Sequence, residues 1–214
     1  MLIDSDVQNY ISSLLPARTG ILEKIESESK ERHIPIVEPE VAQFLRFLIT
    51  VKNPSRIVEI GTGTGYSTIS MAKALKPSAM IETIELNPIR YQEAIENIKV
   101  AGYANQVRLH HGHVFDLLPH IEGEFEFVFM DAAKGQYLEL FNMIFPRLKV
   151  GGIIVAEDIF YEKLVVLDRE DIRKRNRTMS RRLRTYLDLV VNHPQLETTL
   201  VPLGDGLAVS CKKG

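Results

Sequence analysis

The sequence predicts an α/β fold: a doubly wound, mostly parallel seven-stranded sheet with a C-terminal antiparallel hairpin and extra N-terminal helices. Three observations predict this architecture. Short apolar runs rich in Val and Ile alternate with segments of helical periodicity after residue 56. A glycine-rich turn separates the first apolar run from the helix that follows it. Near the C-terminus, two β-rich runs flank Gly204-Asp205-Gly206, a composition that is typical of a hairpin turn.

Residues 1–52 precede the first predicted strand and carry three segments with helical spacing of apolar residues. These predicted helices are Asp4–Leu15, which Pro16 ends, Ile21–Arg32 and Glu38–Val51. The segment His33–Val37 is expected to be extended, because a residue before proline avoids the helical region. The three helices could cover a ligand site or build a dimer face, and the sequence leaves both roles open.

Strands and helices then alternate along the chain. The predicted strands are residues 56–60, 80–84, 107–110, 125–130, 152–156, 197–201 and 207–211. The predicted helices between them are residues 67–74, 87–101, 136–148 and 171–192, with a short helix near 112–118. Asn87 is expected to cap its helix, with Pro88 at the first helical position.

Length and composition fit one globular domain over residues 1–214. Hydrophobic content of 45% and charged content of 25% are ordinary, and the formal net charge of −2 means that any nucleic-acid contact must use a local patch. A single cysteine, Cys211, cannot form an internal disulfide, which favours a reducing compartment. The sequence shows no signal peptide and no apolar run long enough to span a bilayer. We therefore expect a cytoplasmic protein without membrane contact.

The first predicted strand runs directly into the turn Gly61-Thr-Gly-Thr-Gly65. A third glycine three residues after the second would predict a dinucleotide site, but that position is Tyr66. Glu85 closes the second strand, where a carboxylate can accept from the two hydroxyls of a ribose. A glycine-rich turn after strand one with an acid after strand two predicts an S-adenosylmethionine (SAM) site of the class I methyltransferase kind. The alternative is a tight structural turn in an α/β protein of another function.

Three acidic residues follow neighbouring predicted strands: Asp131 after the fourth, and Glu157 and Asp158 after the fifth. Uncompensated carboxylates in one cleft would repel, and some would stay protonated. A divalent cation removes that cost, and an all-oxygen ligand set favours Mg²⁺, with Mn²⁺ as the other candidate. The alternative is that some of these acids cap helices or pair with Lys134 or Lys163.

Lys134 lies three residues beyond Asp131. Next to a dication and partly desolvated, it is expected to have a lowered pKa. It could then accept a proton from a substrate hydroxyl as a catalytic base. The alternative is a surface lysine that pairs with a nearby acid.

These motifs together resemble the cation-dependent O-methyltransferases of the catechol and caffeoyl-coenzyme A type. The matching residues are Glu59–Ser67, Glu85, Asp131-Ala-Ala-Lys134 and Glu157-Asp158, and the resemblance runs nearly end to end. It is greatest to the bacterial branch that methylates 5-hydroxyuridine at the wobble position of tRNA. Three further stretches indicate that branch: His33–Val37, Asp131–Tyr137, and Asn192-His-Pro194 with Val201–Ala208.

The resemblance implies a role for each matching residue. SAM would contact Val37, Gly61, Ser67, Glu85 and Asp131, with Gly112, His113 and Val114 near its adenine. The metal would be bound by Asp131, Glu157 and Asp158, and catalysis would use Lys134 and Asp131.

This chain departs from the family pattern at two places. Relatives usually have aspartate where this chain has His113, and that aspartate would accept from the adenine amino group. Relatives also usually have aspartate-asparagine where this chain has Glu157-Asp158. Glu157 reaches further and Asp158 adds a carboxylate, so the metal affinity and preference are expected to differ.

The segment Asp168–Arg184 is strongly basic. The residues singled out as RNA contacts are Arg173, Lys174, Arg175, Arg177, Arg181 and Arg182. Arginine forks suit phosphate, and phosphate contacts would position an RNA. The alternative is a solvated helix face, with early acids and later arginines that complement a helix dipole.

These features predict a SAM- and Mg²⁺-dependent O-methyltransferase that converts 5-hydroxyuridine of the tRNA anticodon to 5-methoxyuridine. One alternative is a catechol-type enzyme that acts on small molecules through the same site. An alternative of another class is a non-catalytic SAM-binding RNA module, against which the intact acids and Lys134 argue. By resemblance, the protein is also expected to form a homodimer.

Overall fold

The computed structural model describes residues 5–131 and 134–214, and this part of the chain divides into two compact units. The N-terminal unit ends at Ile121, and the C-terminal unit comprises Glu122–Gly214. Asp4, Ala132 and Ala133, which belong to a predicted helix and to a predicted motif, lie outside the described residues.

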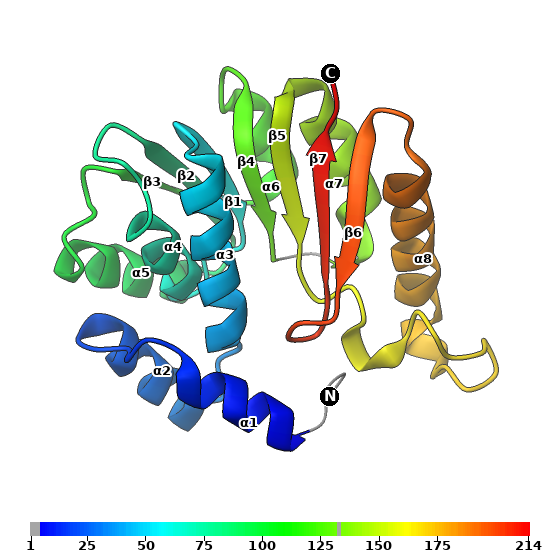
Figure 1. Cartoon of the computed structure of the whole chain (residues 1–214), viewed down its shortest axis with the longest axis horizontal. Helices are drawn as coiled ribbons and strands as arrows, with labels where there is room; N and C mark the ends of the chain where they lie inside the picture. Colours follow the sequence, from blue (N-terminus) through cyan, green and yellow to red (C-terminus); the bar gives the residue numbers. More distant parts are fainter. Residues whose placement is uncertain (1–4, 132–133) are drawn as a thin grey trace. The chain divides into compact units, whose positions relative to one another are not determined.

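The N-terminal unit alternates helices and strands after a helical start (Figure 1). Its elements are α1 (Ser5–Leu14), α2 (Ile21–Arg32), α3 (Pro39–Lys52), β1 (Arg56–Ile60), α4 (Tyr66–Ala72), β2 (Met80–Glu85), α5 (Pro88–Val100), β3 (Val107–His111) and α6 (Val114–Leu117), with a 3₁₀ turn at Leu118–His120. Strand β2 pairs in parallel with β1 on one side and β3 on the other. Asn87 caps α5 as predicted, because its side chain accepts from the backbone N–H groups of Ile89 and Arg90 at 2.9 and 3.1 Å.

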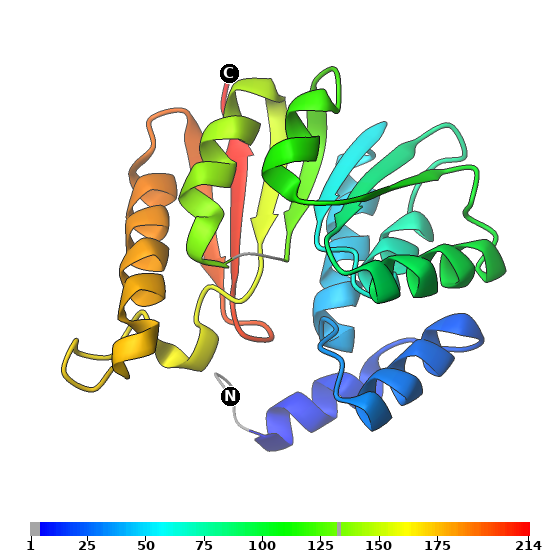
Figure 2. The ribbon, with the colours of Figure 1, turned by 180° about the vertical axis from the view of Figure 1, so that it is seen from behind.

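The C-terminal unit contains β4 (Phe125–Met130), α7 (Tyr137–Ile144), β5 (Leu148–Ala156), α8 (Arg177–Asn192), β6 (Leu196–Val201) and β7 (Leu207–Lys212). Four 3₁₀ turns lie between them, at Lys134–Gln136, Phe145–Arg147, Tyr161–Lys163 and Lys174–Asn176. Its strands lie in the order β4, β5, β7, β6, parallel between β4 and β5 and antiparallel in the two other pairs (Figure 1). Figure 2 shows α7 lying over one face of these strands.

The predicted fold class is confirmed: seven strands form a mixed sheet that ends in an antiparallel hairpin. Strands β1, β2 and β4 are buried over almost their whole length, as parallel strands covered by helices require, whereas the edge strands β3 and β6 are partly exposed. None of the described helices is long and apolar enough to cross a membrane.

Two helices differ most from their predicted bounds, and both are shorter than expected. The helix predicted over residues 136–148 ends at Ile144, because Pro146 has no N–H to donate and its ring clashes with the preceding turn. Leu148 instead begins β5, where it pairs with Phe125 of β4.

The helix predicted over residues 171–192 begins only at Arg177. Residues 168–173 offer one apolar side chain, the buried Ile172, so they have no apolar stripe that could hold a helix on the unit.

Candidate cofactor and metal sites

The glycine-rich turn between β1 and α4 is tied to the end of β2. The backbone N–H groups of Gly61 and Thr62 donate to the Ile84 carbonyl at 3.0 and 3.2 Å. The N–H of Gly63 donates to the Glu85 carboxylate at 2.8 Å, with Gly63 in the left-handed region at a φ of 56°. A Cβ on Gly63 would meet no atom within 4 Å, so this side of the turn is open to the close approach of a ligand.

Glu59, a fully buried carboxylate in β1, fixes the shape of this turn. It accepts from the hydroxyls of Ser67 and Thr83, each at 2.6 Å, and from the hydroxyl of Thr68. Burial raises the pKa of Glu59 above its usual value, although the three hydroxyl donors oppose that rise. This network was not predicted from the sequence, where its signal is one acid inside an apolar strand.

Glu85 lies at the carboxyl end of β2 and is also buried. Its carboxylate accepts from Gly63 and from the N–H of Asn87, the latter at 2.7 Å. The N–H of Gly112 donates to the Glu85 carbonyl at 3.0 Å, which brings the turn after β3 to the same residue. A carboxylate has about four lone-pair sites, so Glu85 keeps acceptor capacity for the hydroxyls of a ribose.

Of the other predicted cofactor residues, Val37, Ser67, His113 and Val114 lie in the same unit and Asp131 lies in the C-terminal unit; their contacts with a cofactor stay predictions. Ser67 is buried with its hydroxyl committed to Glu59. Val37 is buried between α2 and α3, and Val114 is buried at the start of α6. His113 is exposed, and its ring stacks on Phe115 with 5.5 Å between the ring centroids.

The C-terminal unit gathers the three predicted metal ligands. Asp131 follows β4, and Glu157 and Asp158 follow β5, which pairs with β4. One carboxylate oxygen from each residue lies within 4.8 Å of the other two. Asp158 adopts the left-handed region at a φ of 57°, a conformation that aspartate tolerates better than most residues.

The charges of this acid cluster conflict when no cation is present. Burial raises the pKa of Glu157 well above its usual range, and the charges of Asp131 and Asp158 raise it further. An oxygen-only set of close carboxylates matches the preference of a hard divalent cation such as Mg²⁺. Asp131, Glu157 and Asp158 therefore fit the predicted metal site.

Tyr137 connects the two strands that carry the acid cluster, and no role was assigned to it from the sequence. It is fully buried, and its hydroxyl lies 3.2 Å from the Met130 carbonyl and 3.0 Å from the Glu157 carbonyl. It thereby bridges the ends of β4 and β5, from which the three carboxylates project. Its only signal in the sequence is its place at the end of the Asp131–Tyr137 stretch.

Lys134 lies at the acid cluster as predicted, but its pKa is shifted the opposite way. Burial alone would lower the pKa of Lys134, yet the hydrogen bond and charge of Asp158 outweigh burial and raise it. The Lys134 ammonium also lies over the ring of Tyr161, 5.0 Å from its centroid. The prediction of a lowered pKa for Lys134 assumed a divalent cation on the three acids. The charge of that cation would offset the carboxylates that otherwise hold the proton on Lys134.

The basic segment is only partly free to meet a ligand. Arg182 donates to the Gly135 carbonyl at 3.1 Å, and Arg177 donates to the Ile172 carbonyl at 3.0 Å. Arg173, Lys174, Arg175 and Arg181 are exposed. The structure therefore separates arginines whose side chains donate to backbone carbonyls from arginines for which no such bond is described, a distinction that the sequence does not show.

Comparisons with known proteins assign the fold and the family. In structure, the chain is similar to an O-methyltransferase from Bacillus cereus in complex with SAH, at 25% identity, with 97% of each chain covered and a TM-score of 0.86. It is equally similar to TomG from Streptomyces achromogenes in complex with SAM, at 26% identity over 98% of this chain and 96% of that chain, with a TM-score of 0.86.

In sequence, the chain is 33% identical to a catechol O-methyltransferase from Niastella koreensis, over 77% of each chain. It is 25% identical to caffeoyl-CoA O-methyltransferase 1 of Arabidopsis thaliana, over 100% of this chain and 86% of that protein. The mixed seven-stranded sheet with its glycine-rich turn defines a class I methyltransferase fold. More narrowly, the chain belongs to the O-methyltransferase family, whose model matches residues 16–213.

Proposed function

We propose that this protein is a divalent-cation- and SAM-dependent O-methyltransferase that converts 5-hydroxyuridine at the tRNA wobble position to 5-methoxyuridine. The observation that carries the proposal is the acid cluster of Asp131, Glu157 and Asp158, with oxygens within 4.8 Å of one another. A structural acid cluster would be expected to have salt-bridge partners for its charges. Lys134 forms an ion pair with Asp158, and a divalent cation would offset the charge of three carboxylates held this close together.

The cofactor site rests on the turn after β1 and on Glu85. When bound, SAM supplies the sulfonium methyl group. Glu85 would accept from the ribose hydroxyls, while the open face at Gly63 lets the ligand approach the backbone. Both groups are held rigidly, Gly63 by Glu85 and the turn by Glu59, so the cofactor would meet a preorganised site. The relatives with bound SAM or SAH support this use of the fold.

The substrate side of the reaction uses the acid cluster and Lys134. Asp131, Glu157 and Asp158 would hold the divalent cation, which supplies a positive charge that favours the ionised form of a nearby hydroxyl. With the cation bound, the carboxylates would hold the proton on Lys134 less strongly, and Lys134 beside Asp158 could then accept the proton that the hydroxyl gives up. In 5-hydroxyuridine, the 5-hydroxyl and the neighbouring carbonyl oxygen are vicinal, like the two oxygens of a catechol, so one site could orient either.

The basic segment supports RNA as the carrier of the acceptor. Exposed Arg173, Lys174, Arg175 and Arg181 gather positive charge on a chain whose formal net charge is −2. A wobble base in a single-stranded loop can be reached without opening a duplex. This substrate would place the enzyme in the cytoplasm.

A small-molecule catechol-type methyltransferase is the second candidate. The names of the relatives favour it, since they are catechol and caffeoyl-CoA O-methyltransferases. This candidate uses the same acid cluster and requires no part of the basic segment, so turnover should not depend on Arg173 or Arg175.

The test is a methylation assay with labelled SAM, Mg²⁺ and tRNA from a strain that lacks this enzyme. Digestion of the RNA and mass spectrometry should reveal 5-methoxyuridine, and a chelator should abolish it. A parallel reaction offers catechol. Label on catechol alone would reject the tRNA substrate, and label that survives the chelator would reject the metal site.

We also propose that the protein is a homodimer through its N-terminal helices. Val7, Tyr10 and Leu14 are 49%, 66% and 66% exposed and recur at helical spacing, so they form an uncovered apolar face on α1. Light scattering should give a mass of twice the chain mass of 24.3 kDa. The Tyr10→Glu variant should give the mass of a single chain. A monomeric wild type would reject the proposal.

A further inference from the structure

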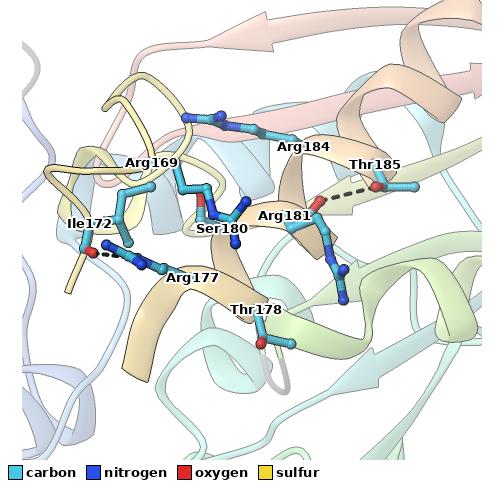
Figure 3. A pocket seen from close by; sticks show the side chains of 8 residues that line it. All are labelled: Arg169, Ile172, Arg177, Thr178, Ser180, Arg181, Arg184 and Thr185. Atoms are coloured by element: carbon cyan, nitrogen blue, oxygen red, sulfur yellow. Dashed lines mark hydrogen bonds between the residues drawn. The ribbon is translucent and has the colours of Figure 1, made fainter. Parts of the chain in front are cut away.

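A cavity of about 380 Å³ lies in the C-terminal unit beside the first half of α8 (Figure 3). We call it the arginine pocket, because Arg169, Arg177, Arg181 and Arg184 line it. Its other lining residues are Ile172, Thr178, Ser180 and Thr185. The volume is within the range of small-molecule sites, roughly 300–1,000 Å³, so it can admit a phosphate with its sugar.

The helical repeat of α8 brings three of these arginines together. Arg177, Arg181 and Arg184 follow one another at spacings of four and three residues, so they share one face of the helix. Arg169 joins them from the turn that precedes α8. Only part of the basic segment therefore lines the pocket. Arg182 does not line it, and its side chain donates to the Gly135 carbonyl instead.

Two of the four guanidinium groups are held in place by backbone carbonyls. Arg177 donates through Nε to the Ile172 carbonyl at 3.0 Å, as Figure 3 shows, and Arg184 donates through Nε to the Val165 carbonyl at 3.2 Å. A guanidinium has five N–H donors, so each retains donors for a ligand. Such restraint reduces the entropy that these side chains lose when an anion binds.

The arginine pocket concentrates positive charge. None of the four arginines forms an ion pair with a described acidic residue, whereas Arg18 and Arg32 elsewhere are paired with Glu26 and Glu93. Like charges in one cavity repel, and a bound anion removes that repulsion. Arginine is the residue best suited to a phosphate, which accepts two N–H donors in parallel.

We propose that the arginine pocket binds a backbone phosphate of a single-stranded RNA acceptor. This inference rests on the proposed RNA substrate and adds a subsite that anchors it away from the reacting base. Ser180 and Arg184 bind the Leu164 carbonyl, and Leu164 follows Asp158 by six residues in the same unit. Six residues span at most about 22 Å, so the pocket lies within reach of the acid cluster for a strand of a few nucleotides.

The test compares two double variants that lose the same charge. Arg169→Gln with Arg181→Gln removes the two pocket arginines for which no side-chain hydrogen bond is described, so the fold should be kept. Arg173→Gln with Arg175→Gln removes two exposed arginines of the same segment that do not line the pocket. The probe is a short anticodon-loop RNA that carries 5-hydroxyuridine, and its binding is followed by fluorescence anisotropy at several salt concentrations.

The pocket variant should bind the RNA roughly tenfold more weakly, the scale of one lost charge-assisted contact. The slope of log K against log salt should shrink by about 0.7, the value for one phosphate on a single strand. The control variant should change both quantities less. Methylation of a small catechol, where the wild type shows it, should be unaffected in both variants.

Equal losses in the two variants would overturn the inference, because they would indicate a diffuse basic surface. Arginine-dependent binding of coenzyme A without binding of RNA would also overturn it, in favour of another phosphate ligand. A wild type that binds the RNA through the pocket without forming 5-methoxyuridine would reject the proposed reaction and leave the phosphate subsite standing.

Discussion

Tyr137 and Tyr186 are neighbouring tyrosines of the C-terminal unit whose hydroxyl groups have opposite surroundings. Both residues are 0% exposed, and their ring centroids lie 5.5 Å apart. The Tyr137 hydroxyl lies within hydrogen-bond distance of the Met130 and Glu157 carbonyls. The Tyr186 hydroxyl is buried, with no hydrogen-bond partner among the described residues. Replacing Tyr137 by phenylalanine should therefore destabilise the fold, whereas the same replacement of Tyr186 should not.

The expected magnitudes follow from these contacts. Tyr137→Phe removes the hydroxyl donor to the Glu157 carbonyl, while the Met130 carbonyl still accepts from the Glu157 N–H at 3.0 Å. Loss of the donor to one buried carbonyl costs about 1–3 kcal/mol. For a chain of this size, each kcal/mol shifts Tm by about 2–4 °C, so Tm should fall by roughly 2–12 °C. Tyr186→Phe removes a hydroxyl whose burial without a partner costs on the order of 1–3 kcal/mol. Its Tm should stay the same or rise.

The assay is thermal unfolding of both variants and the wild type, followed by circular dichroism in a metal-free buffer. Both substitutions delete the same atom from the same residue type at equal burial, so each is the matched control for the other. A Tyr186→Phe variant that is destabilised as much as Tyr137→Phe would refute the reasoning. That result would mean that the Tyr186 hydroxyl has a partner of equal value, such as a buried water.

Three further predictions concern Glu59, Glu157 and the hydrogen bond from Arg182 to the Gly135 carbonyl beside Lys134. Because the pKa of Glu59 is raised, the folded state keeps its proton at pH values where the unfolded chain has lost it. The free energy of unfolding should therefore fall as pH rises through the interval between the two pKa values, and Glu59→Gln should flatten that fall in urea titrations. Mg²⁺ at about 100 times its Kd should stabilise the wild type by about 2.7 kcal/mol, seen as a higher Tm, and Glu157→Gln should abolish this gain. Arg182→Ala removes the donor to the Gly135 carbonyl next to Lys134, and kcat should fall between about twofold and tenfold with KM for SAM unchanged.

Each of these predictions has its own control. Glu23→Gln changes an exposed glutamate in α2, and it should leave the pH dependence of unfolding unaltered. For the metal site, an equal Mg²⁺-induced rise of Tm in Glu157→Gln would show that the ion binds elsewhere. For the Arg182 hydrogen bond, Arg182→Lys should have a kcat closer to that of the wild type than Arg182→Ala, since an ammonium can also donate to a carbonyl. An unchanged kcat in Arg182→Ala would remove Arg182 from the positioning of Lys134.

The sequence predicted the fold more accurately than it predicted the boundaries of individual elements. Strand β4 and helix α5 were predicted to within one residue at each end, because a buried apolar run and an Asn-Pro cap are local signals. Helix α8 was predicted to start too early, since the charges of residues 171–176 suit a helix but offer it nothing to pack against. The sequence also could not predict which arginines line the pocket and which, like Arg182, bond to a backbone carbonyl, because these contacts depend on the folded chain.

The sequence by itself determined which chemical groups this protein holds. Acids at the ends of β2, β4 and β5 and a glycine-rich turn after β1 follow from strand periodicity, because parallel strands place their carboxyl ends together. Only the tertiary structure decided how those groups are held. The hydroxyls on Glu59, the bridge from Tyr137 and the bond of Lys134 to Asp158 join residues whose pairing no local pattern specifies. Burial and contact set the pKa of each group, and both depend on atoms that come close only when the chain has folded.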